Sequence, residues 1–197
     1  KDLFAAKVSK KILDSISAKL ELNKKITQAM QWSEICGTSF YKITWNPTHG
    51  QVVAQDEEGK QIRSGEVEVT VCSPFEIYPD SFTCENLEAC QSIIHARAMD
   101  VSEIKKRYDI DLQGEDINIF SLSSTSVGVG GLGYSSAAPK ISQGVKTNSA
   151  LVIERYEKPS PERPNGRLTI VVGDYLFFDG DLPYEIGADG ARTFPFV

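Results

Sequence analysis

The chain has 197 residues, of which 41% are hydrophobic and 24% are charged. These proportions are typical of globular domains, so they exclude a disordered or fibrous chain. The length allows one well-buried core and a second small lobe. No apolar run approaches the roughly 18 residues that a membrane-spanning helix needs, so no membrane partner is expected.

The net charge is −6, and the longest basic runs are the pairs Lys10-Lys11, Lys24-Lys25 and Lys105-Lys106. Proteins that bind DNA tightly carry clustered lysine and arginine. Strong DNA binding is therefore not expected of this chain. No Cys-x-x-Cys pair occurs among the four cysteines, which are Cys36, Cys72, Cys84 and Cys90. We interpret these residues as free thiols in a reducing cytosol.

The two ends of the sequence suggest a fragment of a longer protein. Lys1 opens a charged amphipathic segment without a signal peptide, and residues 193–197 form an apolar, strand-like run without a polar tail. A natural terminus seldom ends in this way. We expect such a fragment to be monomeric or weakly associated in dilute solution.

Two amphipathic helices are predicted at the start of the chain. Within residues 3–20, apolar side chains recur at four-residue steps, at Phe4, Val8, Ile12, Ile16 and Leu20. Within residues 24–36, a helical period is kept by Ile26, Met30, Trp32 and Ile35. Gly37 is suited to end the second helix with a positive φ. The apolar faces of both helices are expected to lie in a core.

After Gly37, apolar side chains recur at every second residue instead of with a helical period, which predicts strands. Strands are predicted at 38–45, 51–55 and 67–71, with turns at 46–50 and 56–59. Tyr41, Ile43 and Trp45 share one face, and we expect Val67, Val69 and Val71 to share its core. Glu66 and Glu68 are then expected to face solvent.

The segment Ser73–Asp80 contains two prolines, which predict an extended backbone outside any ladder. A strand is expected at 92–99. A short helix is expected at 100–108, because Asp100 and Glu103 have the spacing of a variant capping box. Residues 113–149 are rich in serine and glycine from Ser121 onward, and they are expected to form a long loop or insertion.

Antiparallel strands are predicted again over residues 150–197, with reversals at Asn165-Gly166 and Gly173-Asp174. The sequence therefore predicts an α+β fold, with N-terminal helices followed by mainly antiparallel strands. Its expected parts are a helical segment 1–37, a strand-rich body 38–112, a loop 113–149 and a strand region 150–197. We expect these parts to form one domain.

No catalytic, cofactor or metal site is predicted. Gly128–Gly133 has the spacing Gly-x-Gly-x-x-Gly, but no buried strand precedes it and no helix follows it, as a dinucleotide site requires. His49 and His95 have no metal-ligating neighbour at suitable spacing. We interpret the acidic cluster Asp174, Asp179 and Asp181 as turn residues of a β-hairpin rather than as ligands of a cation.

Four segments resemble tailed-bacteriophage portal proteins. The stretch AMQWSEICGTSFYKITWNP at 29–47 resembles their passage from helix to strand, and GEVEV at 65–69 followed by SPFEIYPD at 73–80 resembles a characteristic string of long family members. VIERYEKPS at 152–160 followed by PNGR at 164–167, and then FPFV at 194–197, resemble the later portion in the same order. The resemblance covers nearly the whole chain except the Ser/Gly-rich stretch.

The resemblance implies structural roles rather than catalytic ones, and it implies no cofactor. The residues that carry it are Gly37, Trp45, Pro74, Phe75, Tyr78, Pro79, Asp80, Asn165 and Gly166. Gly37 ends a helix on which the Trp45 face packs, and the segment from Pro74 to Asp80 redirects the chain. The whole resembles the wing of a portal subunit.

The family forms a ring, typically dodecameric, at one capsid vertex. The resemblance therefore implies a virion protein assembled in the bacterial cytoplasm. Its partners would be other copies of itself, the terminase packaging motor, capsid and scaffolding proteins, and head–tail connector proteins. Double-stranded DNA would pass through the channel without sequence-specific binding, which suits an acidic surface.

Two other classes of function stay open. One is a carbohydrate- or host-binding module of a phage tail or baseplate protein, which would expose Tyr175, Phe177 and Phe178 as an aromatic platform. The portal interpretation instead buries most of these rings. The other is a hydrolase that uses scattered carboxylates, which would require a pocket with converging titratable groups.

Overall fold

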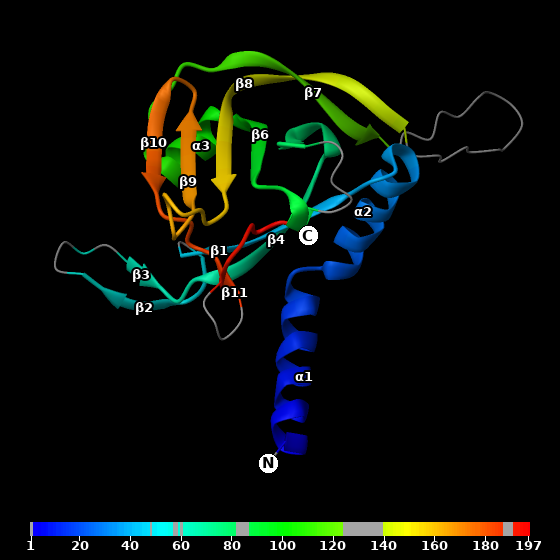
Figure 1. Ribbon diagram of the computed structural model, residues 1–197, viewed down its shortest axis with the longest axis vertical. Helices are drawn as coiled ribbons and strands as arrows, with labels where there is room; N and C mark the ends of the chain where they lie inside the picture. The colour runs from blue at the N-terminus through cyan, green and yellow to red at the C-terminus, as the bar shows by residue number, and fades with distance from the viewer. Residues whose placement is uncertain are drawn as a thin grey trace, which may run out of the picture. The chain divides into compact units, whose positions relative to one another are not determined.

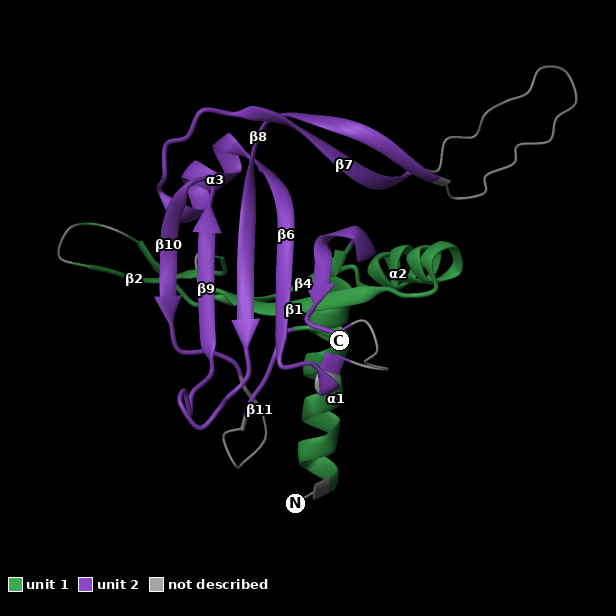
Figure 2. Cartoon of the chain, turned by 45° about the horizontal axis from the view of Figure 1, so that its top comes forward, with its two compact units in different colours: residues 1–72, 196–197 green, residues 73–195 purple. Residues whose placement is uncertain are grey.

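The computed structural model divides the chain into two compact units, residues 1–72 with 196–197 and residues 73–195 (Figure 2). Its architecture is α+β, with two helices first and mainly antiparallel strands after them, as the sequence predicts. The residues that the structure describes are 2–47, 49–56, 59, 61–81, 87–123, 140–186 and 191–197. Cys84 and the Gly128–Gly133 motif therefore lie outside the described residues.

The described residues of the first unit form two helices and four strands, drawn from blue to blue-green in Figure 1. They are α1 (Asp2–Lys19), α2 (Leu22–Cys36), β1 (Phe40–Asn46), β2 (Val52–Gln55), β3 (Gln61–Arg63) and β4 (Glu66–Cys72). Both predicted helices are confirmed. Gly37 follows α2 with φ 77°, and its N–H donates to the Ser33 carbonyl at 2.9 Å. Its predicted position and positive φ are therefore confirmed.

The predicted burial of the two helical faces is wrong. Along α1, Phe4 is 75% exposed and Ile12 is 53% exposed, although both keep the helical period. On α2, only Ala29 and Trp32 are buried, whereas Met30 is 58% exposed. Periodicity identifies which side of a helix is apolar, but it does not say that the same chain covers that side.

The β1–β4 ladder has the predicted register. Tyr41, Ile43 and Trp45 lie opposite Val71, Val69 and Val67. The shared face is thus confirmed, but only Val69 is buried on it, and Trp45 is 58% exposed. The side chains of Glu66 and Glu68 are neither buried nor fully exposed. The predicted apolar core on this face is therefore wrong.

The edge of β1 also pairs with the last two residues of the chain. Tyr41 exchanges two backbone hydrogen bonds with Val197, at 2.8 and 2.9 Å, and Lys42 forms a bridge with Phe196. The Lys42 side chain is buried, and its Nζ lies 5.7 Å from the centre of the Phe196 ring. A separate two-stranded ladder joins β2 and β3.

The second unit is built around one antiparallel sheet of six strands, in the order β10-β9-β8-β6-β5, with β7 also paired to β8. Its elements are η1 (Pro74–Glu76), β5 (Ile77–Pro79), η2 (Leu87–Ala89), β6 (Ser92–Asp100), α3 (Val101–Tyr108), β7 (Glu115–Ser123), β8 (Lys140–Glu157), β9 (Arg167–Val172), β10 (Tyr175–Gly180), β11 (Glu185–Ile186) and β12 (Ala191–Arg192). The predicted strand at 92–99 and the hairpin reversals within the predicted strand region 150–197 are confirmed.

Two predictions for this unit are corrected. The expected loop at 113–149 contains β7 and the first part of β8, which pair from Ser123↔Lys140 to Glu115↔Ser149. The segment Ser73–Asp80 is not outside the ladders, because β5 pairs with β6 after one turn of 3₁₀ helix. Pro79 occupies an edge strand, the place in a sheet where a missing N–H is tolerated.

The core of the second unit lies where α3 covers the sheet. Met99, Ile104, Ala150, Val152 and Val172 form one buried cluster, and Tyr108 and Leu112 pack against it. Asp100 caps α3, since its carboxylate accepts hydrogen bonds from the Ser102 N–H at 2.8 Å and the Ser102 hydroxyl at 2.6 Å. These hydrogen bonds lower the pKa of Asp100.

Candidate assembly surfaces and structural corners

The Ser73–Asp80 motif forms a corner that directs the chain into the sheet. The Ser73 hydroxyl accepts a hydrogen bond from the Phe75 N–H at 3.3 Å, and Pro74 occupies the first turn of η1. The Tyr78 hydroxyl donates to the Phe75 carbonyl at 2.7 Å. Pro74, Phe75 and Tyr78 are therefore brought together, as a structural role requires.

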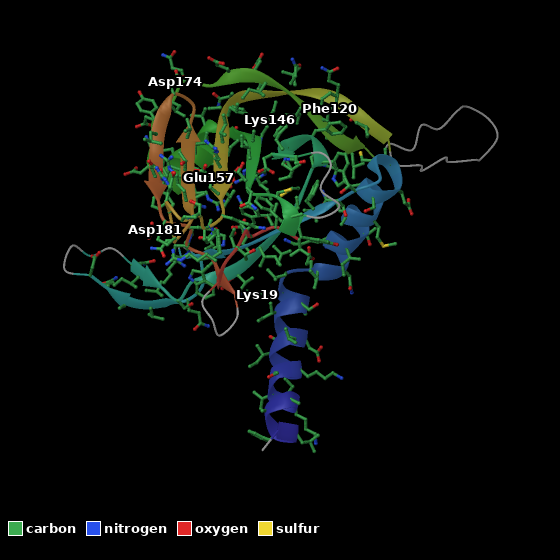
Figure 3. All side chains as sticks on the ribbon, viewed as in Figure 1. Lys19, Phe120, Lys146, Glu157, Asp174 and Asp181 are labelled. Carbon is green, nitrogen blue, oxygen red and sulfur yellow. The ribbon has the colours of Figure 1, made fainter. Side chains whose placement is uncertain are left out.

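Asp80 stabilises the end of this corner through its side chain. Its carboxylate oxygen Oδ2 accepts hydrogen bonds from the N–H groups of Gln91 and Ser92, both at 3.0 Å. The Phe75 ring lies 4.7 Å from the Phe120 ring on β7, centre to centre. Phe120, labelled in Figure 3, was not singled out from the sequence, because it belongs to the segment expected to be a loop.

A second corner surrounds Asn165 and Gly166. The Asn165 side-chain amide donates to Asp181 at 2.7 Å, and the Gly166 N–H donates to the Arg163 carbonyl at 3.0 Å. Gly166 has φ 66°, and a Cβ there would lie 2.5 Å from the Glu157 carbonyl oxygen. Only glycine fits this turn without displacement of the backbone.

The acidic residues of the nearby hairpin mostly have side-chain partners. Asp179 accepts two hydrogen bonds from the Arg167 guanidinium, at 2.6 and 2.7 Å, and a third from the Thr169 hydroxyl at 3.2 Å. The Arg167 hydrogen bonds hold the pKa of Asp179 down at about 2. Asp174 lies at the turn between β9 and β10, at the opposite end of β10 from Asp181 (Figure 3). These contacts fit residues that stabilise a β-hairpin better than residues that bind a cation.

Trp45 and Gly37 lie in the first unit, each with a local role. Gly37 ends α2, as described above. The Trp45 ring covers the backbone of Gly65, where a Cβ would lie 2.4 Å from the ring. Gly65 has φ 69° and is buried. The predicted packing of the Trp45 face in a core is replaced by this contact of the ring with Gly65.

A buried polar cluster lies in the sheet of the second unit and was missed from the sequence. His95 lies opposite Glu154 in the ladder, with Nδ1 3.3 Å from the carboxylate oxygen Oε2. The Tyr156 hydroxyl donates to the same oxygen at 2.7 Å. All three residues are almost completely buried, since His95 is 1%, Glu154 4% and Tyr156 1% exposed.

The environment of this cluster raises the pKa of Tyr156 and of Tyr184, whose ring centre lies 6.4 Å from that of Tyr156. Burial, with Glu154 nearby, raises the pKa of Tyr156 well above 10. The same two causes raise the pKa of Tyr184 to about 12. The Tyr156 hydroxyl therefore keeps its proton at neutral pH and can donate to Glu154. The signal in the sequence was Glu154 on the apolar side of an alternating strand, but only the strand register places His95 opposite it.

Exposed apolar side chains concentrate on two elements, α1 in the first unit and β10 in the second. Tyr175, Leu176, Phe177 and Phe178 are consecutive on β10, and each is between 40% and 63% exposed. Phe177 still contacts the Tyr108 ring edge-on, with centres 4.8 Å apart. The expectation that most of these aromatic rings lie in the core is wrong. Clusters of exposed apolar side chains of this kind mark interaction surfaces.

Within the described ranges, no group of three or more His, Cys, Asp or Glu side chains could hold a metal ion. Cys36, Cys72 and Cys90 are free thiols. Over the same part of the chain, every helix is too short or too polar to cross a membrane. The expectations that the protein is not an enzyme and needs no cofactor stay predictions.

Comparison with known proteins adds no family assignment. No protein-family model matches the sequence, and no curated protein matches it.

Proposed function

We propose that this chain is part of a subunit of a tailed-phage portal ring, which forms the DNA channel at one capsid vertex. The observation that carries the proposal is the apolar stripe of α1, where Phe4 and Ile12 are more than half exposed. A soluble monomer gains nothing from such a stripe, whereas a subunit of an assembly buries it against a neighbour. The sequence resemblance supports the same conclusion.

A ring requires two different surfaces on each subunit. Contacts around a ring are head-to-tail, so the surface on one subunit meets an unlike surface on the next. The chain offers two apolar surfaces of different kinds, a helix in one unit and an edge strand in the other, although the portal interpretation of the sequence predicts that most aromatic rings of that strand are buried. This arrangement suits a ring better than a twofold dimer, which needs one self-complementary surface.

The charge of the chain suits a channel through which DNA slides. The net charge is −6, and no run of consecutive lysines is longer than a pair, whereas proteins that bind DNA tightly carry larger basic clusters. In this proposal the protein belongs to the virion, and its partners are the packaging motor, the capsid and the connector proteins. The DNA contacts the channel without a sequence-specific site.

The proposal is tested by the symmetry of self-association. A mixture of ¹⁴N- and ¹⁵N-labelled chains at high concentration is cross-linked through lysine, and cross-links between light and heavy chains are identified by mass spectrometry. We expect weak association that does not stop at a dimer, with cross-links between unlike positions. A stable twofold dimer whose cross-links join like positions would contradict the ring.

A second candidate function is supported by one specific observation. The exposure of Tyr175, Phe177 and Phe178 is the property expected of a carbohydrate-binding platform, since sugars stack on exposed aromatic rings. Titration of oligosaccharides from the host surface, followed by tyrosine fluorescence, tests this function. Saturable binding that is lost in Tyr175→Ala would favour it over the portal ring.

A further inference from the structure

The second unit has a groove whose chemistry complements α1. The groove has a volume of 690 Å³ and lies where β7, β8 and the β9–β10 turn meet. Its apolar lining includes Leu112, Ile117, Leu151 and Tyr175. Leu151 is 39% exposed and Tyr175 is 57% exposed, so this lining is open to a partner.

The charged lining of the groove is entirely acidic. It consists of Asp111, Glu115 and Asp174. Asp111 forms a salt bridge with Lys105, with Nζ 2.7 Å from Oδ1. Glu115 and Asp174 are therefore the carboxylates that we expect to pair with a basic side chain of a partner. An occupant of this groove should therefore combine an apolar stripe with flanking positive charge.

Helix α1 has these two properties. Phe4, Val8 and Ile12 recur every four residues over about 12 Å of helix axis, at 1.5 Å per residue. Lys7 and Lys11 are also four residues apart and flank the same stripe, at about 100° per residue. Residues 1–25 contain seven lysines and three acidic residues, whereas the remaining residues contain 14 basic and 24 acidic ones.

We propose that α1 of one copy docks in the Leu112–Tyr175 groove of a second copy, with Lys7 and Lys11 facing Glu115 and Asp174. The inference rests on the proposed ring, because it names the two unlike surfaces that the ring joins. The apolar stripe of the helix meets the apolar lining of the groove, and the lysines are placed against its acidic rim. Each copy then gives one helix and receives another, which is a head-to-tail contact.

The first test uses a synthetic peptide of residues 2–19 and the full 197-residue chain. We expect the peptide to shift the NMR signals of Ile117 and Leu151, and to be displaced as salt is raised. The peptide with Lys11→Glu should bind at least fivefold more weakly. The peptide with Lys10→Glu, which has the same net charge but carries it on the far side of the helix, should bind nearly as the wild type does. Equal binding of both variant peptides, or signals that shift only elsewhere, would overturn the proposal.

The second test is a charge swap between copies. One variant chain carries Lys7→Glu and Lys11→Glu, and the other carries Glu115→Lys and Asp174→Lys. Each variant alone should associate more weakly than the wild type, because like charges then face each other. An equimolar mixture should recover the association, since each helix finds a complementary groove on the other variant. No recovery, with both variants folded by circular dichroism, would overturn docking between copies.

The outcomes separate this inference from the proposed function. If the peptide binds the groove and the chains form only twofold dimers, the docking site stands and the ring fails. If the chains associate head-to-tail but the peptide does not bind the groove, the ring stands and this docking site fails.

Discussion

The two units of this protein use their apolar residues in opposite ways. In the second unit, Ile104 and Val152 are 0% exposed and belong to one cluster between α3 and the sheet. In the first unit, most of the apolar residues that keep the helical period lie on the surface. A regular apolar period in a sequence can therefore indicate either side chains in an internal core or side chains on a surface that a partner covers. The same substitution made in each unit, followed by a measurement of stability, distinguishes a core residue from a surface residue.

The largest expected effect comes from matched truncations in the two units. Ile104→Ala should lower the free energy of unfolding by about 2–5 kcal/mol, because it removes a fully buried side chain and leaves a cavity. Ile12→Ala, at a site 53% exposed, should lower it by less than about 0.5 kcal/mol. Urea denaturation at low protein concentration measures both values. Equal losses would show that the α1 stripe packs within its own chain.

Tyr156→Phe tests whether the buried polar cluster stabilises the second unit. The substitution removes the hydroxyl that donates to Glu154 at 2.7 Å and should cost about 1–3 kcal/mol, since a buried carboxylate loses a donor. Tyr78→Phe is the matched control, because its hydroxyl also donates at 2.7 Å but belongs to a residue that is 48% exposed. We expect that control to lose less than about 0.5 kcal/mol. A cost for Tyr156→Phe no larger than that of the control would show that Glu154 does not depend on this hydroxyl.

Much of the fold was predictable because it rests on local chemistry. Gly37, the Asn165-Gly166 reversal and the β1–β4 register follow from helix stops, turn residues and alternation. The β7–β8 arm was missed because serine, glycine and other small residues dominate the sequence from Ser121 onward, and the apolar side chains of the arm, such as Ile117 and Phe120, are only partly buried or exposed. The His95–Glu154 pair was missed because it depends on the β6–β8 register, which joins residues 59 apart in the sequence. The groove combines residues from four segments and has no contiguous signal.

Two glycine substitutions compare a tight turn of the second unit with a helix end of the first. Gly166→Ala should destabilise the chain by about 2 kcal/mol, because it adds a Cβ against the Glu157 carbonyl at a positive φ. Gly37→Ala has the same unfavourable φ but no atom within 4 Å of the new Cβ, so we expect about 1 kcal/mol. Thermal and urea unfolding of both variants give the comparison. The reverse order would mean that the Gly166 turn relaxes freely.

The smallest effect concerns acid stability. The pKa of Asp179 is about 2 in the folded chain and 3.8 ordinarily, so its stabilising contribution is complete above about pH 4 and disappears as the pH falls toward 2. Asp179→Asn should therefore flatten the decrease of Tm between pH 4 and pH 2. A slope that is the same in Asp179→Asn and wild type would show that the Arg167 contact does not persist in solution.

The long strand β8 changes its neighbours along its length. Residues 152–157 pair with both β6 and β9, whereas among the described strands residues 140–146 pair only with β7. Asn148, with φ 49°, marks the passage between these two stretches. Local opening of the arm breaks one ladder, whereas opening of the inner stretch breaks two ladders and exposes Val152. Amide protons along a single strand should therefore exchange with solvent at two distinct rates, fast before Asn148 and slow after Leu151.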